Sequence, residues 1–135
     1  MAFAYFEHDA DVGVVGRGKT ITQAFAAAAQ AVFAIVTDLD AIHSDDELVI
    51  EFEESDLELA LVVMLNLILG KSRELGMVFN DFHVHHKGDQ WQVRMSGEKW
   101  HAGLQRGVEV KGATLTMLSV KQSDGMWEAR CVVDV

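Results

Sequence analysis

The residues best suited to chemistry lie at the two ends of the chain. Near the start, His8, Asp9 and Asp11 fall close together in a short segment. Carboxylates placed this densely repel one another unless solvent, a cation or a basic group of a partner compensates their charge. At the other end, Asp134 adjoins Val135, which carries the terminal carboxylate. Both ends of the chain are therefore anionic.

A metal site would bring these two ends together. A site formed by Asp11, Asp134 and the Val135 carboxylate would consist entirely of oxygen ligands, which suit hard cations such as Ca²⁺, Mg²⁺ or Mn²⁺. It requires that the first and last strands lie side by side. The alternative is that these acids are solvated residues at strand ends.

A second motif follows the acidic opening. The segment from Gly13 to Thr20 matches G-x-x-x-x-G-K-[ST], the phosphate-binding loop, and it precedes a helix. The preceding segment is acidic rather than a buried apolar strand, and the chain is short for the parallel sheet that normally holds this loop. We therefore interpret Gly13 to Lys19 as a glycine-rich turn or loop.

Histidines and a cysteine offer weaker candidates. His83 and His85 share one face of a strand and have spacing competent for a metal, but we favour polar residues on an edge strand. Cys131 lies in an apolar alternating segment, which favours a small core residue over a nucleophile.

Composition limits the classes of protein that the chain can represent. Its 135 residues fit one domain spanning residues 1–135, and its net charge is −10, from 21 acidic and 11 basic residues. This charge disfavours tight binding to a nucleic-acid backbone and permits binding to cations or a basic protein surface. One cysteine and no basic start followed by an apolar run indicate a cytoplasmic protein. The apolar run 57–69 is too short to span a membrane.

The periodicity predicts two helices and several strands. One helix begins at Thr20, where Gln23 completes a capping box, and a second opens with Ser55 and Glu58 and ends near Gly76. Alternation predicts strands in the following order: 3–7, 47–53, 82–86, 91–95, 108–122 broken by Gly112, and 126–135. Residues 96–107 read as a loop. The order β-α-β-α followed by a β-meander predicts an α+β fold, a mostly antiparallel sheet with two helices on one face.

Several segments together resemble the archease family, small proteins that assist the RtcB-type RNA-splicing ligase. The opening Glu7-His8-Asp9-Ala10-Asp11-Val12-Gly13 is similar to the family's E-H-T-A-D-[VI]-G, with Asp9 in place of Thr. Three further matches extend the resemblance over the whole chain: Val36-Thr37-Asp38, Glu109-Val110-Lys111-Gly112-Ala113-Thr114 against E-V-K-A-x-T, and the closing Val133-Asp134-Val135.

This resemblance implies a function and a set of ligands. It implies a metal site made of Asp11, Asp134 and Val135, holding a divalent cation, with Ca²⁺ first and Mg²⁺ or Mn²⁺ as alternatives. Asp9 adds a carboxylate that the usual site lacks. The implied role is to promote guanylylation and multiple turnover of an RtcB-type RNA ligase partner, without catalysis by this chain.

Three other functions remain open at this point, and one of them is nucleotide binding through Gly13 to Thr20. A standalone metal-dependent phosphoesterase or hydrolase would need a general base, for which His8 is the local candidate. A general chaperone-like module would need a broad exposed apolar patch. The sequence leaves the oligomeric state open.

Overall fold

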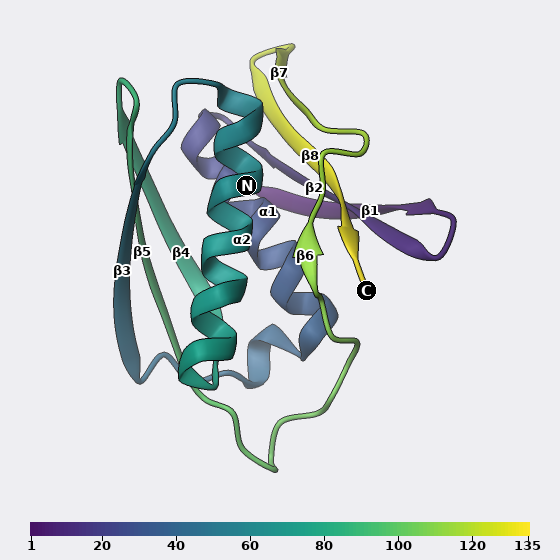
Figure 1. Cartoon of the computed structure of the whole chain (residues 1–135), viewed down its shortest axis with the longest axis vertical. Helices are drawn as coiled ribbons and strands as arrows, with labels where there is room; N and C mark the ends of the chain where they lie inside the picture. The colour runs from purple at the N-terminus through teal and green to yellow at the C-terminus, as the bar shows by residue number, and fades with distance from the viewer.

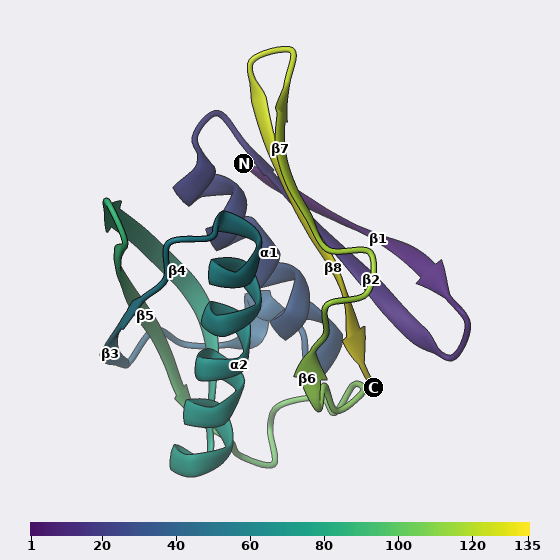
Figure 2. The ribbon, with the colours of Figure 1, turned by 45° about the horizontal axis from the view of Figure 1, so that its top comes forward.

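The computed structural model describes residues 1–135 as two helices between two antiparallel sheets (Figures 1 and 2). The elements in chain order are β1 (Ala2–His8), β2 (Asp11–Gly18), α1 (Ile21–Val36), the short 3₁₀ helix η1 (Leu39–Ala41), β3 (Asp46–Glu53), α2 (Leu57–Leu75), β4 (Met77–Lys87), β5 (Gln90–Lys99), β6 (Gly112–Ala113), β7 (Ser119–Ser123) and β8 (Met126–Asp134). None of the helices is long and apolar enough to cross a membrane.

The strands divide into two sheets. The large sheet has the order β1-β2-β8-β6, with β7 also pairing with β8, and the small sheet has the order β3-β5-β4. Every pairing is antiparallel. The α+β class with two helices and antiparallel strands is thus confirmed, while the strands form two sheets with the helices between them.

Helix α1 fills the space between the two sheets because it packs small side chains against one sheet and an aromatic side chain against the other. Thr20 caps it, since the Gln23 N–H donates to Thr20 Oγ1 at 3.2 Å, as the capping box predicts. Its alanines, all buried except Ala34, let the backbone of β2 approach closely. On the other side, Phe25 stacks on Trp91 of β5 with ring centroids 4.9 Å apart. One continuous cluster of 30 buried residues results.

The N-cap of helix α2 lies one residue after the predicted cap, Ser55. Asp56 rather than Ser55 is the N-cap, and its carboxylate accepts from the N–H groups of Glu58 and Leu59. The predicted end is confirmed, because Gly76 adopts the left-handed conformation with φ 63°. Leu59 is 40% exposed, so the outer face of this helix is not covered by either sheet.

Three of the predicted segments differ from the structure. The predicted turn or loop from Gly13 to Lys19 is largely strand β2, in the middle of a ladder. Strand β5 extends to Lys99, so the loop expected from residue 96 begins later. The strand expected over 108–122 is reduced to β6 and β7, and Gly112 pairs with Asp134 instead of breaking the strand.

Candidate functional site

The pairing of β2 with β8 brings the two acidic ends of the chain together. These strands are antiparallel, with Val12 opposite Val133, so Asp11 and Asp134 are the next pair in the same register. Residues directly opposite each other on antiparallel strands project to one face, with Cβ atoms about 5 Å apart. Strand β2 rather than β1 is therefore the neighbour of the last strand, and the two aspartates share one face of the large sheet.

His8 extends this row by one strand. It is opposite Asp11 in the β1–β2 register, which makes a row of His8, Asp11 and Asp134 across three strands, called here the acidic row. The His8 Nδ1 is buried and has no hydrogen-bond partner. The sequence offered His8 only as a candidate base, and the register of the hairpin is what shows it to be a neighbour of the aspartates.

The acidic row has no basic side chain to balance its charge. Neither Asp11 nor Asp134 takes part in an ion pair. Asp11 is half-buried, while Asp134 is exposed. The Asp134 main-chain carbonyl accepts from the Lys111 N–H at 2.8 Å, which fixes the strand end and leaves the carboxylate free. Unbalanced carboxylates on one face fit a divalent cation, and the buried Nδ1 of His8, the residue opposite Asp11, has no hydrogen-bond partner of its own.

Next to the acidic row, aromatic packing determines the shape of the outer face. The Phe6 ring covers Gly13, where an added Cβ would lie 2.2 Å from Phe6 Cζ. The Arg130 guanidinium lies over the same ring, 4.3 Å from its centroid. A side chain larger than hydrogen at position 13 would displace this ring, which explains a glycine two residues after Asp11.

Asp9 has a different role from Asp11. It lies in the tight connection between β1 and β2 and adopts φ 52°, a left-handed conformation that aspartate tolerates better than most residues. Asp9 is exposed and has no place in the acidic row. Its presence is explained by the conformation of the turn.

The phosphate-loop match does not form such a loop. Residues 12 to 17 pair with β1 on one side and β8 on the other. Their N–H groups therefore point along the sheet and cannot surround a phosphate. An added Cβ at Gly16 would lie 2.1 Å from the Ala24 carbonyl oxygen, so this glycine allows β2 to pack on α1. The motif thus has a packing function.

The remaining candidates behave as structural residues. Cys131 is fully buried, and burial raises the pKa of its thiol to about 12, which leaves it protonated and unreactive. Strand β4 is an edge strand, as expected, and both His83 and His85 are exposed on it. His83 Nε2 lies 3.2 Å from Asp81 Oδ2.

The sequence model of the archease protein family matches residues 3–135. This chain belongs to the archease family. Among its relatives, the archease of Methanopyrus kandleri is 33% identical over 148 residues, covering 100% of both chains. The archease of Pyrococcus furiosus is 34% identical over 137 residues, covering 97% of this chain and 96% of the relative.

Solved structures of similar fold agree with the family assignment. The solution structure of a protein from Methanobacterium thermoautotrophicum has a TM-score of 0.83 and 26% identity, covering 99% of both chains. The crystal structure of an archease from Thermotoga maritima, described there as a possible chaperone, has a TM-score of 0.63 and 17% identity, covering 96% of this chain and 94% of that one. The latter supports the fold alone.

Proposed function

We propose that this member of the archease family is an accessory protein of an RtcB-type RNA ligase, which promotes guanylylation of the ligase and its multiple turnover. In this proposal the chain is not itself an enzyme. The observation that carries the proposal is the acidic row, in which Asp11 and Asp134 lie opposite each other on an accessible face with no basic partner. A role as accessory protein of such a ligase also implies that this chain is cytoplasmic.

The residues that would hold the cation are Asp11, Asp134 and Val135. Strands β2 and β8 fix the two aspartates at neighbouring strand ends of the large sheet, and Val135 directly follows the end of β8. A bound divalent cation would supply a positive charge able to order phosphate oxygens. Without it, the unbalanced carboxylates of this face would repel a nucleotide.

Charge also supports docking on a partner rather than on RNA. The chain has a net charge of −10. An enzyme that joins RNA needs a basic surface for the phosphate backbone, and such a surface attracts an acidic protein. In this picture the acidic row faces the active site of the ligase, where Asp11 and Asp134 position the ion beside the nucleotide phosphates.

The decisive experiment is a ligation assay with a limiting amount of RtcB-type ligase and excess RNA. The wild-type protein should sustain many rounds of ligation, while Asp11→Ala and Asp134→Ala should permit about one round. Glu53→Ala is the matched control, since it removes one exposed carboxylate from β3 of the small sheet and should leave turnover unchanged. The proposal is wrong if both row variants, shown to be folded, still sustain multiple turnover.

A chaperone-like function is the second candidate, because apolar side chains are exposed in the segment between β6 and β7. Leu115 is 63% and Met117 54% exposed. Apolar groups on a surface can hold unfolded chains. This alternative predicts that the protein suppresses aggregation of unrelated proteins and that Leu115→Ser removes the effect. Suppression without any change in ligase turnover would favour it over the ligase role.

A further inference from the structure

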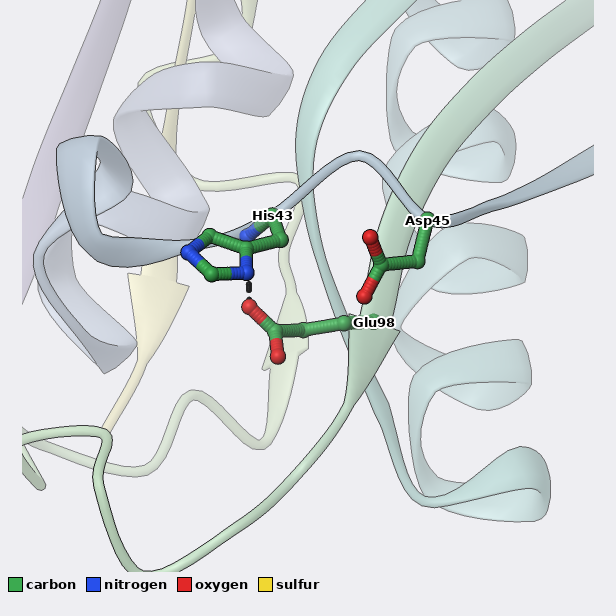
Figure 3. Close-up of side chains that lie close together, drawn as sticks. All are labelled: His43, Asp45 and Glu98. Atoms are coloured by element: carbon green, nitrogen blue, oxygen red, sulfur yellow. Dashed lines mark hydrogen bonds between the residues drawn. The ribbon is translucent and has the colours of Figure 1, made fainter.

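A second group of potential metal ligands lies on the small sheet, outside the acidic row. It consists of His43, Asp45 and Glu98, called here the histidine–carboxylate cluster. One ring nitrogen or carboxylate oxygen from each residue lies within 4.8 Å of the others. Figure 3 shows the three side chains reaching into one shared space between the segment that enters β3 and the end of β5.

The backbone holds these residues in place before any ion binds. Asp46 is opposite Gly97 in the β3–β5 ladder, so Asp45 and Glu98 are the next pair in that register. The segment before β3 is fixed by Asn80, whose amide nitrogen donates to the Ile42 carbonyl at 2.9 Å. Ser44 Oγ donates to Asn80 Oδ1 at 3.0 Å. His43 is therefore held between two anchored neighbours.

Glu98 is the buried centre of the cluster. It is 7% exposed, and each oxygen of its carboxylate has one hydrogen-bond partner. Its Oε2 accepts from the His43 main-chain N–H, and its Oε1 lies 2.8 Å from His101 Nε2. The His43 bond and the His101 bond lower the pKa of Glu98 against the opposing effect of burial, so this group is an anion at neutral pH.

Two hydrogen bonds fix the position of the His101 ring. The Gly103 N–H donates to His101 Nδ1 at 3.1 Å, so Nδ1 is an acceptor and Nε2 carries the proton that it gives to Glu98. His101 thereby orients the Glu98 carboxylate.

No lysine or arginine balances the carboxylates of the cluster. Asp45 contributes a second carboxylate close to Glu98, and neither forms an ion pair with a lysine or arginine. Two carboxylates this close repel each other unless a cation lies between them. The neighbouring His43 ring supplies a nitrogen donor on the same side. The chemistry of the site is that of a cation bound by one imidazole and two carboxylates.

We propose that His43, Asp45 and Glu98 bind a transition-metal ion of the Zn²⁺ class, with His101 as a positioning residue for Glu98. Imidazole selects Zn²⁺, Co²⁺ or Ni²⁺ over Ca²⁺ and Mg²⁺. Ligand atoms around a tetrahedral Zn²⁺ are about 3.4 Å apart for bonds of about 2.1 Å, which small side-chain rotations would reach from the present spacing. His43 and Asp45 are exposed, so a fourth position is open to water or to a ligand from a partner.

The test is a Zn²⁺ titration of the full chain without a histidine tag, in saturating Ca²⁺ so that the acidic row is not available. We expect one Zn²⁺ per chain, and a visible absorption band when Co²⁺ replaces it. His43→Ala and Asp45→Asn should each weaken binding about 100-fold, and His101→Ala about tenfold, as expected for a residue that orients a ligand. His101→Gln, which keeps an N–H donor, should restore part of the loss.

His83→Ala is the matched control, because His83 is also exposed and also lies beside a carboxylate, that of Asp81. It should leave Zn²⁺ affinity unchanged. Equal affinity of wild type and both His43→Ala and Asp45→Asn would overturn the proposal, as would loss of binding in His83→Ala. His43→Ala and Asp45→Asn change exposed side chains, so both proteins should fold. Thermal melting checks this, so that a loss of Zn²⁺ binding can be assigned to the missing ligand. The outcome is independent of any ligase assay.

Discussion

The two sheets each place carboxylates near a strand end, but the two groups are built differently. On the large sheet, long strand pairings hold the three residues of the acidic row beside one another, and Asp134 is exposed. The histidine–carboxylate cluster on the small sheet surrounds a buried Glu98 that neighbouring N–H groups hold in place. An accessible, unfixed carboxylate can adapt to a partner, whereas a buried and oriented one is suited to hold an ion within its own chain.

The largest expected effect is a separation of the two ion affinities. Asp11→Ala should lower Ca²⁺ affinity about 100-fold, which equals about 2.7 kcal/mol, and leave Zn²⁺ affinity unchanged. His43→Ala should lower Zn²⁺ affinity and leave Ca²⁺ affinity unchanged. Thermal melting with each ion measures this, because an ion that binds the folded state raises the melting temperature. If either variant loses both responses, the two groups are not separate sites.

A smaller effect is expected from the contact between β2 and α1. Gly16→Val should lower the free energy of unfolding by about 2 kcal/mol, since its Cβ would meet the Ala24 carbonyl oxygen at 2.1 Å. Because β2 carries Asp11, Ca²⁺ affinity should fall while Zn²⁺ affinity is retained. Urea unfolding and ion titration measure the two quantities.

Gly70→Ala is the control for that variant. Nothing lies within 4 Å of a Cβ added at Gly70 in α2, so alanine should raise stability by about 0.5–1 kcal/mol. A Gly16→Val protein as stable as wild type would show that β2 does not depend on close packing against α1.

The pH dependence of stability should distinguish Glu98 from an ordinary surface acid. Its folded-state pKa is lowered from the usual 4.5, so the ionised group stabilises the fold above that pH, and this contribution is lost as the pH falls through the lower folded-state value. Glu98→Gln should therefore be clearly less stable than wild type at pH 7, and the difference should shrink below pH 4.5. A difference that stays constant between pH 7 and pH 3 would contradict this.

The smallest effect is expected at Asp9. Asp9→Gly keeps the left-handed turn at φ 52° and removes only the carboxylate, so stability should change by about 0.5 kcal/mol or less. Calorimetric Ca²⁺ affinity should match that of wild type. A tenfold loss of affinity would make Asp9 a ligand and would extend the acidic row into the turn.

Local signals in the sequence predicted those parts of the fold that local chemistry determines. The cap at Thr20 and the helix end at Gly76 are both confirmed. The prediction of a turn or loop from Gly13 to Lys19 is wrong because it follows the local preference of glycine for turns. In the structure, close contacts with Phe6 and with α1 require glycine in this segment. Only the three-dimensional packing contains that information.

The same distinction applies to the two groups of ligands. Asp11 and Asp134 were predicted because dense acids and the terminal residues stand out in the sequence. The sequence contains no local signal for His43, Asp45 and Glu98, because they come from two separate segments and Glu98 falls in the predicted loop 96–107. The register of β3 with β5, not any pattern along the chain, brings them together.

The pairing of β2 with β8 also has a consequence for how the protein is made. Arg17 on β2 and Glu128 on β8 bond across 111 positions of sequence. Closing so long a segment is slow, so the large sheet should form late and the small sheet, with its nearby strands β4 and β5, should form early. During synthesis, β2 cannot pair with β8 until the end of the chain has been translated. A nascent chain would therefore acquire the histidine–carboxylate cluster first and the acidic row last.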